Sequence, residues 1–298
     1  IGTNLSLRLT KQMNDVTIVD NYCTSKNKFS FWYKTGVKVI QEDIINYKPE
    51  GDFDIIINLA CAATPKKYQS NPTHTLDTCY IGTKNLLSLM GPKTIFLQAS
   101  TSEVYGDPLI KEQSEDYYGN CNCFGERSCY DEGKRIAETL CYEKIKEGYN
   151  VKIARIFNTY GPYMELDDGR VITNLISQVM NKQPLTIYGS GKQTRSFQYI
   201  DDLLEGLEKL IESNINEPVN LGNPYEEVTM LQLANEILIA LDVKDEYSIE
   251  FKELPSDDPK VRKPNIQKAI TELNWSPKIT LNDGIKKIYD YLCINMTI

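Results

Sequence analysis

IGTNLSLRLTKQMNDVTIVD, residues 1–20, places a glycine at the start of an amphipathic helix and an aspartate at the end of a short apolar strand. A dinucleotide-binding βαβ unit needs a glycine turn, a helix whose N-terminus faces the pyrophosphate, and an acidic residue about 20 positions on for the adenosine ribose. The stretch therefore predicts a dinucleotide site that includes Ile1, Gly2, Asp20 and the following Asn21.

The acidic side chain of Asp20 favours NAD over NADP, because a 2′-phosphate would be repelled there. The strand and the earlier glycines that normally precede Gly2 are not in this sequence. We expect the natural chain to extend upstream by roughly a dozen residues, enough for one strand and a glycine turn.

Outward from this stretch, residues 1–160 alternate between short apolar runs and helical patterns near 3–12, 72–91 and 129–148. The runs are almost continuously apolar, as expected for strands covered on both faces. This alternation predicts an α/β fold, a doubly wound parallel sheet of the Rossmann type. The runs are VTIVDN (16–21), VKVIQEDI (37–44), DIIINLA (54–60), TIFLQAS (94–100) and VKIARIF (151–157).

The regular alternation of apolar runs and helical patterns ends after Gly161. This change predicts a first, NAD-binding domain over 1–160 and a smaller substrate lobe over 161–298. We expect residues of about 194–225 to return to the first domain. No Gly/Ser-rich linker separates the two, so they should share one interface. The predicted elements are helices near 170–181, after 201–202, and near 229–241, 264–274 and 280–292, and a strand at 185–189.

The bulk properties exclude several classes of function. A net charge of −8 without a basic run argues against nucleic acid and anionic membranes as partners. No apolar stretch of 18 residues exists in the visible chain, so it should not span a membrane. The eight cysteines form no CxxC pair and there is one histidine, His74. We therefore expect a reducing, cytoplasmic compartment, no metal site and a structural histidine, although a leader upstream of Ile1 would be invisible.

Two further strand ends are candidates for the cofactor site. Asp43 and Ile44 close the run at 37–44, where a carboxylate could accept from an adenine amine; an ordinary polar strand end is an equally good reading. Leu59 and Ala60 end the run at 54–60, at the carboxyl edge where ligands sit in such sheets.

A tyrosine four residues before a lysine places both side chains on one helical face, where the ammonium can lower the pKa of the phenol. The chain contains five such pairs, so the spacing alone decides nothing. Only Tyr130/Lys134 begins a long helix after the strand 94–100, whose end carries the polar cluster 100–103. We predict Tyr130 as the catalytic base. The other pairs are Tyr22/Lys26, Tyr80/Lys84, Tyr142/Lys146 and Tyr188/Lys192.

Seven ordered motifs together resemble the UDP-glucuronate decarboxylases of the extended short-chain dehydrogenase superfamily, and the resemblance runs from Gly2 to about residue 292. The motifs are ASTSEVYGDP (99–108), SCYDEGKRIAET (128–139), ARIFNTYGP (154–162), DDGRVITN (167–174), LTIYGSGKQTRSFQYIDDL (185–203), NLGNP (220–224) and DDPKVRKPNI (257–266).

The discriminating detail is Thr101–Ser102–Glu103. The related 4,6-dehydratases carry an Asp–Glu pair there, and Ser102 removes the acid that would expel water. A nucleotide-sugar 4-epimerase or a 4,6-dehydratase of the same fold remains the first alternative, and an inactive NAD-binding regulator the second.

The resemblance implies a closed redox cycle with tightly bound NAD. Tyr130 takes the proton of the sugar 4-OH as hydride leaves C4, the 4-ketone allows carbon dioxide to leave from C6, and return of the hydride gives UDP-xylose. Thr101 and Ser102 would hold the sugar hydroxyl and carboxylate, Glu103 would position the ring and assist at C5, and Lys134 would hold the ribose.

By the same resemblance, the substrate UDP-glucuronate would be bound by residues spread over the second half of the chain, and Thr78 and Ser100 would add to the cofactor site. Arg262 would face the phosphate or the sugar carboxylate, since guanidinium groups suit bidentate anion binding. The substrate set is Glu103, Asn158, Arg170, Asn174, Tyr188, Arg195 and Arg262.

The resemblance also implies a homodimer, paired through apolar residues of the helix at 129–148: Ile136, Ala137, Leu140 and Ile145. Two departures from the family touch the cofactor side. Cys79 stands after Thr78 where the family usually has asparagine, and Ala62 and Ala63 appear where a proline is usual.

Overall fold

The structure, a computed structural model, describes residues 1–24, 31–32, 35–48, 51–166, 169–243, 247–253 and 261–296. Its centre is a four-stranded parallel sheet with the order β10-β5-β4-β3, and β1 and β2 form a separate parallel pair. The strands are β1 (Thr17–Asp20), β2 (Lys38–Gln41), β3 (Ile55–Asn58), β4 (Ile95–Thr101), β5 (Asn150–Ile156) and β10 (Pro218–Leu221). The predicted α/β fold with parallel strands is confirmed.

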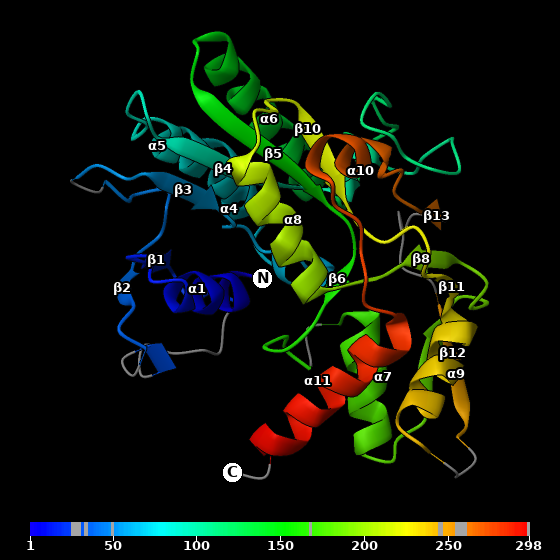
Figure 1. Cartoon of the computed structure of the whole chain (residues 1–298). Coiled ribbons are helices and arrows are strands. Elements are labelled where there is room, and N and C mark those ends of the chain that lie inside the picture. The colour runs from blue at the N-terminus through cyan, green and yellow to red at the C-terminus, as the bar shows by residue number, and fades with distance from the viewer. Residues whose placement is uncertain are drawn as a thin grey trace.

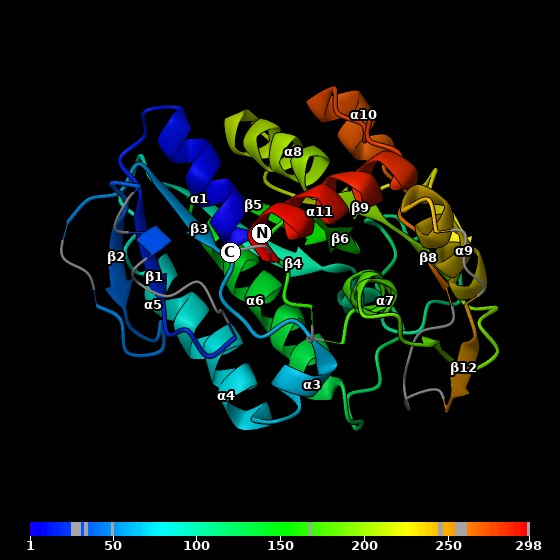
Figure 2. The ribbon, with the colours of Figure 1, turned by 90° about the horizontal axis from the view of Figure 1, so that it is seen from below.

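Helices cover both faces of this sheet (Figure 1). Figure 2 shows one group of helices on one side of the strands and a second group on the other. The first group is α4 (Pro72–Asp77), the single π turn η1 (Thr78–Gly82), α5 (Thr83–Leu87) and α6 (Ser128–Lys146). The second is α1 (Gly2–Lys11), α8 (Ile200–Glu212) and α10 (Gln267–Leu273).

The central strands are buried on both faces. Phe96 and Val151 pack into the core beneath α5 and α6, whereas Leu97 and Ala154 pack into the larger core beneath α1 and α8. Successive residues of a strand point to opposite faces, so both sides of β4 and β5 must be apolar. This is why the sequence shows continuous apolar runs instead of alternation.

The second half of the chain supplies further helices and short strands, which match the expected positions closely. β8 lies between β11 and β13, and β7 pairs with β12. The elements are β6 (Thr159–Tyr160), α7 (Val171–Met180), β7 (Leu185–Tyr188), β8 (Thr194–Ser196), β9 (Gln198–Tyr199), β11 (Glu227–Thr229), α9 (Met230–Ala240), β12 (Ile249–Lys252), β13 (Val261–Arg262) and α11 (Leu281–Met296).

The sequence predicts one helix over 72–91, whereas the structure has three consecutive helical segments there. α4 and α5 are joined by the π turn η1, and the last residues of the expected helix lie beyond Leu87. Single π turns inside helices are frequent at functional sites. Here the turn holds Thr78 and Cys79, both buried beside α6.

The expected dimer face of α6 is only partly a surface, so this expectation is corrected. Ala137 is fully buried, and Leu140 and Ile145 pack against the core beneath the sheet. Of the four residues proposed for the contact, Ile136 alone is exposed, at 42%. α6 lies directly on β4 and β5, so most of its apolar stripe is needed inside the subunit.

Candidate active site

Tyr130 and Lys134 lie one turn apart at the start of α6, and both are buried, with 6% and 5% of their surface exposed. The Lys134 Nζ donates to the backbone oxygen of Ala99 at 2.9 Å and lies 5.8 Å from the centre of the Tyr130 ring. The helix thus holds both side chains against the end of β4, as the sequence predicted.

Burial separates this pair from the other tyrosine–lysine pairs. Tyr80, Tyr142 and Tyr188 are 43%, 57% and 43% exposed, so those phenols face solvent. Lys26, the partner of Tyr22, lies outside the described residues. Among the pairs that the structure describes in full, Tyr130/Lys134 alone occupies an interior site.

The environment of Tyr130 works against ionisation in the protein by itself. Burial raises the pKa of the phenol well above its usual value near 10, and the neighbouring Cys61 thiol raises it further, while a hydrogen bond with Thr101 acts in the opposite direction. We expected the Lys134 ammonium to lower this pKa. In the protein by itself, burial outweighs any such effect and keeps the pKa of Tyr130 high.

The cluster at the end of β4 continues into the 3-10 turn η2 (Ser102–Tyr105). The Thr101 hydroxyl caps this turn by accepting from the Glu103 backbone N–H at 3.3 Å. Thr101 and Ser102 are buried, and the Ser102 hydroxyl accepts from the guanidinium of Arg262 at 3.2 Å. The cluster therefore lies at the carboxyl edge of the sheet, where the Thr101 side chain hydrogen-bonds with Tyr130.

Arg262 reaches this edge from the far end of the chain. Its strand β13 pairs in parallel with β8, and Arg262 is the direct register partner of Arg195. The Arg262 side chain is 2% exposed and donates to Glu103 Oε2 at 3.0 Å and to the Gly106 carbonyl at 3.2 Å, while its Nε has no partner in the structure.

Glu103 is an ionised carboxylate in this setting. Burial acts to raise its pKa, but the charges of Arg262 and Arg127 outweigh burial and hold the pKa below its usual value. Arg127 donates from Nη2 to Glu103 Oε2 at 2.8 Å. Arg127 was missed in the sequence, although its place three residues before Tyr130, at the start of the same helix, could have indicated it.

Two other neighbours of Tyr130 were also missed. Tyr68 stacks on the Tyr130 ring with centroids 4.9 Å apart and planes 10° from parallel. It belongs to the four-residue helix α3 (Pro65–Tyr68), which is too short to show a periodic signal. Asp131 follows Tyr130 and is 6% exposed; burial and then the charge of Glu103 raise its pKa to about 7.

The start of α1 fits a dinucleotide. Its N-cap, Ile1, provides no side-chain hydrogen bond, and its first turn has no acidic residue, so the helix terminus is suited to an anion. Gly2 faces Leu59, because a Cβ added there would lie 3.7 Å from Leu59 Cδ1. Asp20 ends β1, and burial raises the pKa of its carboxyl group.

Asp43 is held by its own neighbours. Its Oδ2 accepts from Asn21 at 2.7 Å and lies 2.7 Å from His74 Nε2, and its Oδ1 accepts from the Ile45 N–H. Burial acts to raise the pKa of Asp43, but these hydrogen bonds and the His74 contact lower it overall. His74 is thus a partnered structural residue, and Asn21 and Asp43 lie in direct contact.

Other expected cofactor residues use their side chains inside the protein. Thr78 donates to the His74 carbonyl at 2.7 Å, and the Ser100 hydroxyl donates to Glu138. The Ser100 hydroxyl therefore keeps only its acceptor capacity for any further contact. Ile44 is buried in the core beneath α5, and Ala60 lies half-buried at its edge.

The expected substrate residues frame the second half of the site. Asn158 follows β5, Arg170 is the N-cap of α7, and Asn174 lies one turn further along that helix. Tyr188 ends β7, and 43% of its surface is exposed. On β8, Arg195 donates from Nη1 to the backbone carbonyl of Thr194 at 2.8 Å. The charge of Arg195 also helps to lower the pKa of Glu103, so Arg195 belongs to the same cluster of charges.

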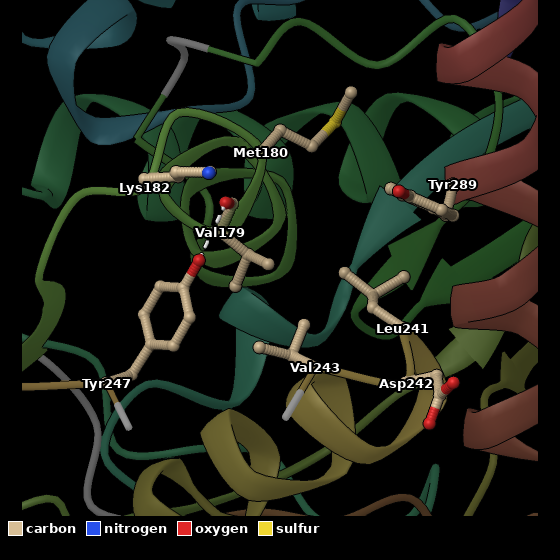
Figure 3. Close-up of a pocket in the computed structure, with 8 residues that line it drawn as sticks. All are labelled: Val179, Met180, Lys182, Leu241, Asp242, Val243, Tyr247 and Tyr289. Carbon is tan, nitrogen blue, oxygen red and sulfur yellow. Dashed lines mark hydrogen bonds between the residues drawn. The ribbon is translucent and has the colours of Figure 1, made fainter. Parts of the chain in front are cut away.

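A hollow of about 470 Å³ lies beside the start of α6 and is lined by Gln69, Pro72, Gly125, Glu126, Ser128 and Cys129. A second, of about 440 Å³, lies between α7, α9 and α11 and includes none of the predicted site residues (Figure 3). There Tyr247 donates from its hydroxyl to the Val179 carbonyl at 2.9 Å, which ties the chain to the end of α7.

Within the described residues, no group of three or more His, Cys, Asp or Glu side chains could hold a metal ion. None of the helices described is both long enough and apolar enough to cross a bilayer.

Comparison with known proteins identifies relatives over the whole fold. Residues 1–222 match the model of the NAD dependent epimerase/dehydratase family. The chain is 47% identical to UDP-glucuronic acid decarboxylase 1 of Arabidopsis thaliana, over 97% of this chain and 66% of that protein. It is 45% identical to UDP-glucuronic acid decarboxylase 1 of Danio rerio, over 98% of this chain and 70% of that one. The chain thus spans about two thirds of the length of these relatives.

Among solved structures, the UDP-glucuronic acid 4-epimerase of Bacillus cereus, in complex with UDP-glucuronic acid and NAD, superposes with a TM-score of 0.84 at 27% identity, over 99% of this chain and 96% of that one. The UDP-glucose 4-epimerase of Thermotoga maritima reaches a TM-score of 0.87 at 21% identity, over 99% and 96% of the two chains. The second likeness speaks for the fold alone.

Proposed function

Because the chain belongs to the NAD dependent epimerase/dehydratase family and, within it, to the UDP-glucuronic acid decarboxylases, we propose that it converts UDP-glucuronate to UDP-xylose and carbon dioxide. The observation that carries the proposal is the contact of buried Arg262 with Ser102 and Glu103, beside Tyr130. This arrangement brings Tyr130, a base for a sugar hydroxyl, close to Arg262, a cation suited to a sugar carboxylate. It also has Ser102 where the dehydratases have an acid.

NAD is the cofactor that the residues fit. The uncapped start of α1, Gly2 against Leu59, and Asp20 at the end of β1 would hold the pyrophosphate and adenosine ribose, with Asn21 and Asp43 near the adenine. Bound there, NAD⁺ would supply the hydride acceptor for C4 of the sugar and would give the hydride back to the 4-ketone after carbon dioxide is lost.

Tyr130 takes the proton from the sugar 4-OH. Thr101, which is hydrogen-bonded with the phenol, holds the oxygen of the sugar 4-OH against Tyr130. Lys134 contributes a fixed positive charge beside the ring, anchored by the Ala99 carbonyl. The high pKa of Tyr130 in the protein alone makes the phenol a strong base once ionised, and the positive charges around it determine how much is ionised.

Decarboxylation breaks the C5–C6 bond, whose electrons pass into the enolate formed from the 4-ketone. Arg262 and Ser102 are placed to orient the C6 carboxylate, and Glu103 is kept ionised by two guanidinium groups, so its charge can hold the sugar ring by its hydroxyls. A proton then returns to C5, and carbon dioxide is the only fragment released from the sugar.

The nucleotide would lie over the second half of the chain. Asn158, Arg170, Asn174 and Arg195 offer amide and guanidinium donors for the pyrophosphate, and half-exposed Tyr188 offers a ring face for the uracil. In a protein of net charge −8, such donors must attract the anionic substrate locally.

The proposal is tested by incubating the protein with UDP-glucuronate and NAD⁺ while released carbon dioxide and the sugar product are followed. We expect one carbon dioxide and one UDP-xylose for each substrate consumed. A UDP-hexuronate product without carbon dioxide would identify an epimerase instead. UDP-glucose is the matched control, since it lacks the carboxylate and should release no gas.

We further propose a homodimer formed through exposed apolar residues of neighbouring helices on one face. Leu76, Tyr80, Ile136 and Tyr142 are 41–57% exposed and lie on α4, η1 and α6, which pack side by side (Figure 2). A two-fold contact would bring this face against its own copy. The eight unbridged cysteines support a reducing, cytoplasmic compartment for this assembly.

A further inference from the structure

Two thiols lie next to each other on the wall of the active site. The sulfur atoms of Cys61 and Cys79 are 3.5 Å apart, although the residues are 18 positions apart in the chain. Cys61 follows β3 in the loop that begins with Leu59 and Ala60, and Cys79 lies in the π turn η1. At this separation the two thiols share a hydrogen bond, in which either sulfur could be the donor.

The packing around Cys79 keeps the two sulfurs together. Gly133 of α6 faces it so closely that an added Cβ would lie 3.1 Å from the Cys79 Sγ and 3.2 Å from its Cβ. Cys79 is 2% exposed, whereas Cys61 is half-buried and packs against the cluster that contains Tyr130. A small oxidant therefore has access from the Cys61 side.

The charges nearby favour reaction at this pair. A hydrogen bond from the Cys61 thiol lowers the pKa of Cys79, burial opposes this, and the positive charge of Lys134 lowers it further. The same hydrogen bond and, after it, burial raise the pKa of Cys61. Thiolate character is what makes a cysteine nucleophilic, so Cys79 is the reactive partner.

We propose that Cys61 and Cys79 are a modification site at which peroxide forms a reversible disulfide that inactivates the protein. Peroxide oxidises one sulfur to a sulfenic acid and is reduced to water; the other sulfur displaces the hydroxyl, which leaves as a second water. A thiol reductant reverses the bond by exchange. The loss of turnover rests on the proposed function, whereas bond formation does not.

The bond would distort the cofactor side of the site. A disulfide is about 2.05 Å long, so the two sulfurs must approach by about 1.5 Å. The loop carrying Leu59 and Ala60 and the turn carrying Thr78 would be drawn together. Cys61 also packs against the cluster of Tyr68, Cys129 and Tyr130, so its movement would displace the proposed catalytic base Tyr130.

The test treats the full chain with hydrogen peroxide, alkylates the remaining thiols and maps the tryptic peptides without reduction. Lys66 and Lys67 separate the two cysteines, and the peptides 39–66 and 68–84 each contain one cysteine, so a cross-link joins two distinct peptides. We expect these two to be joined, the other six cysteines to be alkylated, and the activity lost on oxidation to return with dithiothreitol.

Two variants make the test specific. Cys79→Ser should form no cross-link, and peroxide should change its activity little relative to its own untreated sample. Cys141→Ser removes a fully buried cysteine of α6, away from the pair, and should cross-link like the wild type. The proposal is overturned if the two peptides stay separate, or if Cys79→Ser is inactivated as strongly as the wild type. A cross-link in a protein without decarboxylase activity would instead overturn only the proposed function.

Discussion

Arg262 donates from Nη2 to Oε2 of Glu103 at 3.0 Å, and this ion pair joins two residues 159 positions apart in the chain. The same carboxylate oxygen accepts from Arg127 at 2.8 Å. Glu103 is thereby kept ionised between two cations at the edge where Tyr130 lies. A charge buried in this way depends on its partners, so the pair can be tested by both stability and activity.

Arg262→Met should lower both stability and turnover. It leaves Glu103 with Arg127 alone, and breaking a buried pair typically costs about 3–5 kcal/mol of unfolding free energy. Thermal unfolding and carbon dioxide release would be measured together. Arg262→Lys keeps a positive charge beside Glu103 and should recover part of the stability, but it loses the set of guanidinium donors to Ser102, Glu103 and Gly106, so its activity should stay low. An Arg262→Met variant as stable as the wild type would contradict the pairing.

Arg262→Ala should weaken binding of UDP-glucuronate or let the 4-keto intermediate accumulate with little pentose formed. The first result would show that the guanidinium holds a phosphate, and the second that it orients the C6 carboxylate. Product analysis by mass spectrometry, with isothermal titration of UDP-glucuronate, distinguishes them. Unchanged affinity together with normal UDP-xylose formation would remove Arg262 from the site.

Tyr130→Phe should keep substrate binding and lose hydride transfer. The ring and its stacking on Tyr68 are preserved, and removal of a general base typically lowers the rate by about 10²–10⁴-fold. The rate is measured as carbon dioxide release and as the transient NADH absorbance. Tyr142→Phe, in an exposed pair of the same spacing on the same helix, is the matched control and should behave as wild type. Near-normal release by Tyr130→Phe would refute the assignment.

Asp131→Asn should stabilise the protein increasingly as pH rises. The pKa of Asp131 is raised to about 7 by burial and by the charge of Glu103, whereas an unfolded aspartate titrates near about 3.9. The folded state therefore holds an extra proton between these values, and stability falls as pH rises through them. The melting temperature of the variant minus that of wild type should grow from pH 4 to pH 7 and then level off. A difference that is constant with pH would show that Asp131 is not held protonated.

Ile136→Glu should give a monomer where the wild type is a dimer, since it places a charge in the proposed apolar contact of α6. Multi-angle light scattering at micromolar concentration measures the mass directly. Ile239→Glu, at an exposed position on α9, is the control and should leave the dimer intact. A wild-type protein that is monomeric at this concentration would exclude the contact altogether.

Local pattern was sufficient for most of the architecture. The apolar runs around Phe96 and Val151 indicated parallel strands covered on both faces, and the five-residue frame from Tyr130 to Lys134 indicated a shared helical face. These features depend on neighbours in the chain, and backbone periodicity records such neighbours directly. The π turn at 78–82 left no such mark, because it changes the hydrogen-bond register without changing the apolar pattern.

The sequence by itself determined the α/β order of the chain and the family motifs around Tyr130, and it predicted a cofactor unit from one glycine and one aspartate. Only the tertiary structure decided that this tyrosine is the buried one, that Arg127 and Arg262 meet at Glu103, and that Cys61 touches Cys79. The physical reason is that burial and charge contact depend on where distant strands and helices pack. Local periodicity specifies each element and the face it buries, but the contacts between elements arise only when they share one core.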